Sequence, residues 1–208
     1  MKMNQTNYSQ TETDRRLRNL WLASIAEHRV LPEYVELLVH SARPLATFVL
    51  DRMIVVGVTL PNGFFVTDYA FCVDAANFDL SFGTQIALKK VRDLVYVLEG
   101  YRLMQHLRPV TQPFPELWAN AISSRKLSKE YVSRLVHSAP REVQTMMGCE
   151  THVSIRLPNN FTVSGRAAVI NSAEYDKEKG TEIALQRIEE QVFMLEGYLL
   201  THALYETN

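Results

Sequence analysis

An internal repeat is the feature of this sequence that most limits how the chain can fold. A shift of 97 residues places Trp21 on Trp118 and Gly83 on Gly180. Over residues 20–107 the two copies align without a gap, and about 32 of the 88 aligned pairs are identical, far above chance. The repeat therefore predicts two homologous domains in tandem.

The segments outside and between the copies set the expected domain boundaries. The opening stretch MKMNQTNYSQTET is polar and lacks the apolar run of a signal peptide, so we expect a flexible tail over residues 1–13. Residues 108–115 hold three prolines, which cannot continue a helix and favour an extended linker. We therefore expect repeat domain one over residues 14–107 and repeat domain two over residues 116–208.

Each copy shows the same order of sequence patterns. Two stretches with helical spacing come first, and Ser128 is placed to cap the second of them in copy two. Two alternating strands follow, joined by a Pro-Asn turn, and Asp74 or Asn171 can then cap a long final helix from about residue 75 or 172. This order predicts an α+β fold of two homologous α-α-β-β-α domains, each a β-hairpin packed against helices.

Composition and motifs argue against several classes of function. The formal charge of −1 favours no general affinity for nucleic acid, and no apolar run is long enough to span a membrane. Cys72 and Cys149 have no counterparts in the other copy, which argues against a disulfide framework or a repeated metal site. No phosphate loop, zinc-ligand spacing or catalytic Ser-His-acid combination recurs. We expect no catalytic residues, no metal, no cofactor and no membrane contact, and hence no enzyme.

Two duplicated pairs of titratable residues are secondary candidates for ligand binding. His40 and His137 end equivalent helices, where structural and ligand-binding roles are both open. Glu99 and Glu196 stand in the apolar phrase Leu-Glu-Gly-Tyr of the final helix, where a carboxylate is costly to bury. They are expected either to accept hydrogen bonds from the backbone or from tyrosine, or to face a ligand.

The main candidates come from a difference between the two hairpins. In copy two most of the outward positions are polar and include His152 and Arg166, whereas in copy one most of the equivalent positions are apolar. A monomer rarely leaves such a patch bare, so we expect domain two, the amino-terminal helix, a partner protein or a planar ligand to cover it. The candidate ligand-binding or partner-binding residues are Val55, Phe65, Tyr69, Phe71, His152 and Arg166.

The motifs resemble those of a family of small proteins of tailed bacteriophages, which are typically single-copy accessory products. Copy one carries LPNGFFV, ANFDLSFGTQIA and LEGYRL, and copy two carries LPNNFTV, AEYDKEKGTEIA and LEGYLL. Copy two departs from the family pattern at Asn160 and Tyr175, where the family has Gly and Phe. The tryptophan that typically precedes the last motif is replaced by Val97 and Met194. The resemblance implies a phage protein in the cytoplasm of the infected bacterial host, here as a tandem duplication.

These observations lead to a functional hypothesis of binding without catalysis. The protein is expected to bind a host protein, or to sequester a nucleotide-like signalling molecule of bacterial immunity, in anti-defence or host takeover. The alternatives are a nucleic-acid-binding module that uses Tyr69 and the arginines at 15, 16 and 18, and, least favoured, a nucleotide hydrolase. Because relatives of tandem proteins often pair about a two-fold axis, we expect a monomer with pseudo-two-fold symmetry or a homo-oligomer.

The expected linker gives a direct test by limited proteolysis. We expect a protease to cut near Arg108 or within the polar amino-terminal tail before it cuts inside either repeat, because exposed polar segments are cleaved first. Mass spectrometry of the first fragments measures this order. First cleavage between Ile86 and Leu98 would contradict the two-domain organisation.

Overall fold

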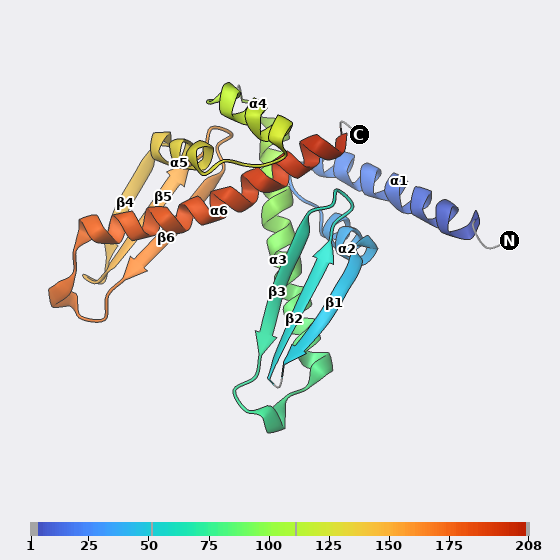
Figure 1. Cartoon of the computed structure of the whole chain (residues 1–208), viewed down its shortest axis with the longest axis horizontal. Helices are drawn as coiled ribbons and strands as arrows, with labels where there is room; N and C mark the ends of the chain where they lie inside the picture. Colours follow the sequence, from blue (N-terminus) through green and yellow to red (C-terminus); the bar gives the residue numbers. More distant parts are fainter. Residues whose placement is uncertain (1–3, 51, 111, 207–208) are drawn as a thin grey trace. The chain divides into compact units, whose positions relative to one another are not determined.

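The computed structural model describes residues 4–50, 52–110 and 112–206. The chain divides into two compact units, Met1–Leu103 and Met104–Asn208. Both units combine helices with a three-stranded antiparallel sheet, so the α+β class and the two homologous domains are as predicted (Figure 1).

The same elements occur in the same order in both repeats. The first repeat contains α1 (Asn4–Glu27), α2 (Pro32–Ser41), β1 (Arg43–Leu50), β2 (Met53–Thr59), β3 (Phe65–Phe71), the 3-10 turn η1 (Ala75–Asn77) and α3 (Leu80–Leu107). The second repeat contains α4 (Pro115–Ser124), α5 (Lys129–Ser138), β4 (Arg141–Met146), β5 (Glu150–Arg156), β6 (Thr162–Ala168), the 3-10 turn η2 (Ser172–Glu174) and α6 (Lys177–Glu206). The helix α1 includes residues 4–13, for which the sequence suggested a flexible tail.

Each sheet has one strand more than the predicted hairpin. The strand orders are β1-β2-β3 and β4-β5-β6, so β1 and β4 are the additional strands. The fold is therefore α-α-β-β-β-α rather than α-α-β-β-α. The sequence did not predict β4, because a strand is recognised by apolar residues at every second position. In β4 the side chains on both faces are nearly all exposed, so this pattern is missing.

The long final helix of each unit covers one face of the sheet. In the first unit, Ile54 and Val56 of β2 and Ala70 of β3 form a buried cluster with Ala87 of α3. In the second, α6 runs along the sheet and packs on β5 and β6 (Figure 1). Side chains on the other face of each sheet point away from the core, which is the inward and outward alternation expected from the sequence.

The predicted Pro-Asn turns join the central strand to the third strand in both sheets. Gly63 and Asn160 adopt left-handed backbone angles, with φ of 88° and 66°. Asn tolerates this region better than most residues, so Asn160 serves where the family pattern has Gly. The side-chain oxygens of Asn62 and Asn159 accept hydrogen bonds from the amides of Phe64 and Phe161 at 3.1 and 3.0 Å.

The final helices begin later than predicted, because a separate 3-10 turn precedes each of them. Asp74 and Asn171 cap η1 and η2 rather than the long helices. The first turn of α3 is capped by Asp79, which accepts from the amide of Phe82 at 2.9 Å. Asp176 caps α6 by accepting from the amides of Glu178 and Lys179. The Asp of the family pattern is therefore the helix cap.

Close packing between α6 and the sheet leaves no room for a side chain at Gly165. A Cβ at this position would overlap the backbone carbonyl oxygen of Ala184 and lie 2.9 Å from Cγ1 of Ile188. We expect Gly165→Ala to lower the free energy of unfolding by about 1–3 kcal/mol, as overpacking usually does. Chemical denaturation measures the change, with Thr162→Ala, at an exposed position on the same strand, as the control. Equal stability of the two variants would contradict this packing.

Candidate functional site

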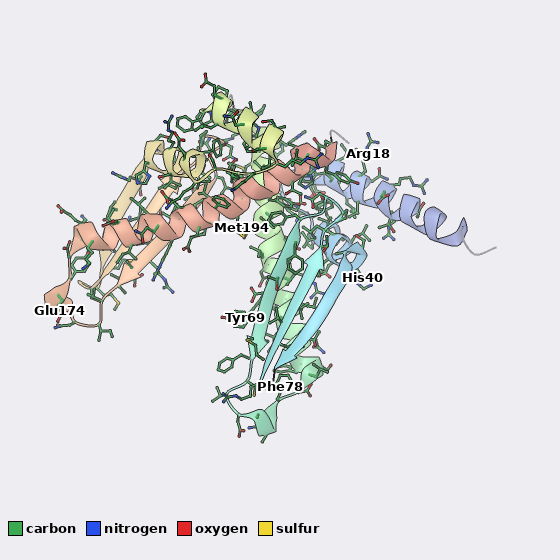
Figure 2. The ribbon with its side chains drawn as sticks, in the orientation of Figure 1. Arg18, His40, Tyr69, Phe78, Glu174 and Met194 are labelled. Carbon is green, nitrogen blue, oxygen red and sulfur yellow. The ribbon has the colours of Figure 1, made fainter. Side chains whose placement is uncertain are left out.

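The outward face of the first sheet carries the apolar candidates together. Val55 on β2 lies directly opposite Tyr69 on β3, so the two side chains share one face of the sheet. Phe65, Tyr69 and Phe71 are 51%, 53% and 64% exposed, and the Tyr69 side chain projects clear of the ribbon of β3 (Figure 2). These four candidates of the first repeat therefore share one sheet face, on which the three aromatic residues are exposed and Val55 is half-buried. We call this surface the aromatic face: Val55, Phe65, Tyr69 and Phe71.

Neighbouring residues hold the aromatic face in place. The ring of Phe65 lies over Gly57, where a Cβ would meet it, so this glycine makes space for the ring. The ammonium of Lys90 on α3 lies 4.9 Å from the centre of the Tyr69 ring and donates to the Tyr69 carbonyl at 2.7 Å. This bond also occupies an edge carbonyl of β3, the outer strand of the sheet.

The equivalent face of the second sheet is polar. His152 on β5 lies directly opposite Arg166 on β6, at the positions that Val55 and Tyr69 hold in the first repeat. Beside this pair the hydroxyls of Ser154 and Ser164 are 2.9 Å apart. Arg187 on α6 donates to the Arg166 carbonyl, which is the counterpart of the Lys90 contact. The structure thus brings His152 and Arg166 together on one face.

The buried carboxylates of the final helices are bound by tyrosines from the preceding short helices. In the second repeat the Tyr131 hydroxyl donates to Glu196 at 3.1 Å, and Trp118 packs on the same tyrosine with ring centres 5.6 Å apart. In the first repeat Glu99 is fully buried and pairs with Arg102 at 3.2 Å. Arg102 also contacts the Tyr34 hydroxyl at 3.2 Å.

These contacts agree with a structural role for Glu99 and Glu196. Burial, followed by the negative charge of Glu99, raises the pKa of the Tyr34 phenol. Burial and the charge of Glu196 raise the pKa of the Tyr131 phenol in the same way. Both phenols therefore stay protonated and act as hydrogen-bond donors. Sequence reasoning missed Tyr34 and Tyr131 as their partners, although the same 97-residue shift duplicates them.

The secondary histidine candidates lie at the ends of the short helices. His40 is in the last turn of α2 and is exposed (Figure 2). His137 is in the last turn of α5, where its Nδ1 lies 2.9 Å from the Ser133 carbonyl oxygen and 3.5 Å from a carboxylate oxygen of Glu189. The two histidines are not equivalent in their surroundings, and His137 borders a groove.

That groove lies between α5 and α6, and sequence reasoning did not find it. Its volume is about 620 Å³. The residues that line it include the following: Val132, His137, Glu182, Leu185, Glu189 and Phe193. The helical patterns of the two elements indicated their apolar sides, but a groove arises only when two helices pack, and no local pattern reports that.

Two further findings concern the described part of the chain. No group of three or more His, Cys, Asp or Glu side chains lies close enough to hold a metal ion among those residues. None of the helices in that part combines the length and apolar content that crossing a membrane requires.

The repeated fold and its motifs define a tandem α+β protein, and the family follows from comparison. The model of the Phage protein (N4 Gp49/phage Sf6 gene 66) family matches the chain twice, over residues 23–107 and 120–204. These matches cover more than half of the chain, so the protein belongs to this family. The resemblance to phage proteins and the tandem duplication are thereby confirmed. No curated protein and no solved structure matches the chain.

The raised pKa values of the buried tyrosines predict a loss of stability in alkali. An unfolded tyrosine releases its proton near pH 10, whereas Tyr34 and Tyr131 keep theirs in the folded state. Their contribution to stability is therefore full below about pH 10 and falls as the pH rises toward the folded-state pKa. We expect the free energy of unfolding to fall more steeply above about pH 10 in the wild type than in the Tyr34→Phe, Tyr131→Phe variant. Denaturant titrations followed by circular dichroism measure both slopes, and equal slopes would contradict the assignment.

Proposed function

We propose that this protein is a non-enzymatic binding protein of the phage, and that its aromatic face binds a host protein. The observation that carries the proposal is the difference between the two outward sheet faces. The third strand of each sheet pairs with its central strand in the same register. At the positions of Phe65, Tyr69 and Phe71, the second repeat has a threonine, an arginine and an alanine. The fold does not need aromatic side chains there, so a contact outside the sheet is the physical reason to keep them.

The shape of the face favours a protein partner. Small-molecule sites are concave and bury most of their ligand, whereas Phe65, Tyr69 and Phe71 stand exposed on an open sheet face. Exposed aromatic residues are typical of the centres of protein interfaces. Since Lys90 occupies the Tyr69 carbonyl at the sheet edge, the partner would contact the face rather than add a strand.

A second candidate function is supported by the polar face of the second repeat. His152 and Arg166 lie side by side across β5 and β6, next to the hydroxyls of Ser154 and Ser164. Such donors suit an anionic, nucleotide-like small molecule. Sequestering a signalling molecule of this class in the host cytoplasm would serve anti-defence, whereas binding a host protein would serve anti-defence or host takeover.

The two repeats supply their own exchange experiment. We expect the variant Phe65→Thr, Tyr69→Arg, Phe71→Ala, which copies the second repeat, to lose the host protein while keeping its melting temperature. The readout is mass spectrometry of proteins and metabolites recovered with tagged protein from infected cells, wild type against variant. Arg166→Glu is the matched change on the polar face, and it should leave protein capture intact.

The outcomes separate the competing functions. Loss of a small molecule, and not of a protein, in Arg166→Glu would favour the second candidate. Recovery of nucleic acid with steep salt dependence would favour a nucleic-acid-binding module instead. A chemically altered metabolite, in place of an intact one, would identify an enzyme and overturn the proposal.

A further inference from the structure

The groove between α5 and α6 has an apolar floor and an acidic border. Val132 and Leu185 are buried in the floor, and Phe193 is 43% exposed there. Glu182 and Glu189 lie along α6 at the border, seven residues apart, which is about 10 Å along a helix. From Glu182 to Phe193 the lining follows α6 for about three turns, or about 16 Å.

In the first repeat an ion pair spans the corresponding place between the short and the long helix. Arg92 on α3 bonds Glu36 on α2 with an N–O distance of 3.0 Å, so the pair links the two helices across this position. The equivalent residues in the second repeat are Glu189 and Ser133. They cannot form that link, since one is acidic and the other is a short hydroxyl.

The loss of the link changes the charge of the second repeat's groove. Glu189 lies 3.5 Å from His137 at the end of α5 instead of meeting an arginine across the helices. Glu190 adds a third carboxylate to the border, against the single lysine Lys129. The groove is therefore elongated, apolar at its base and negatively charged along α6.

We propose that this groove binds an amphipathic helix of a partner protein that carries lysine or arginine on the borders of its apolar face. Grooves between two helices accept a third helix through apolar anchors spaced at three and four residues. The carboxylates of Glu182 and Glu189 complement basic side chains one or two turns apart on such a helix. This inference does not depend on the proposed function, because the aromatic face belongs to the other repeat.

The test uses the full chain and a defined probe. The probe is a fluorescein-labelled 18-residue amphipathic peptide of leucine and lysine, and the control peptide carries glutamate in place of lysine. Ser133→Glu, Glu189→Arg copies the ion pair of the first repeat and should close the groove. We expect it to weaken binding of the lysine peptide about tenfold or more by fluorescence anisotropy. Glu178→Gln, an exposed site on α6 with the same unit change in net charge, should bind as the wild type does.

A second variant and fold controls keep the test decisive. Phe193→Ser removes the exposed ring from the floor and should weaken binding without restoring the link between the helices. Circular dichroism and melting temperatures establish that each variant is folded. The proposal is overturned if the wild type binds both peptides equally, if it shows no saturable binding of the lysine peptide, or if both folded groove variants bind it unchanged.

Discussion

The buried hydrogen bonds between a tyrosine and a glutamate are the interactions on which each repeat depends. A carboxylate in the middle of a buried helix is costly unless its oxygens are bound, and losing its donor would leave it uncompensated. Tyr131 supplies that donor to Glu196, which ties α5 to α6 and thereby positions α5 against the helix that carries the sheet. In the first repeat Arg102 joins the cluster, where the second repeat has Leu199.

Paired substitutions show how the core keeps its geometry while its chemistry changes. In the first repeat Phe78 packs on the apolar cluster that contains Ile54. At the same positions the second repeat has Tyr175 and Thr151, whose hydroxyl oxygens lie 2.8 Å apart. The second repeat thus has a hydrogen bond where the first has an apolar contact. A tyrosine beside Ile54, or a phenylalanine beside Thr151, would leave a hydroxyl without this partner. The departure of Tyr175 from the family pattern is thus explained by its neighbour.

Features that neighbouring residues determine could be predicted from the sequence, whereas features that depend on residues far apart in the chain could not. The turns at Gly63 and Asn160, the cap at Ser128 and the outward aromatic residues depend on local period and backbone preference, and these predictions were confirmed. The strand β4 was missed because it lacks an apolar face, and the groove because two helices must meet to form it. The Arg92–Glu36 pair joins residues 56 positions apart, which no periodicity reports.

The repeats differ on their surfaces as well as in some of their supporting contacts. The Trp, Tyr and Glu positions are kept in both, as are the capping Asp residues. The outward sheet face and the place between the short and long helices differ in polarity and charge. Two identical subunits would each present the same surfaces, so a symmetric pair cannot assign different surfaces to its halves. A fused duplication removes that constraint, and one chain can then present an aromatic face on one repeat and an acidic groove on the other.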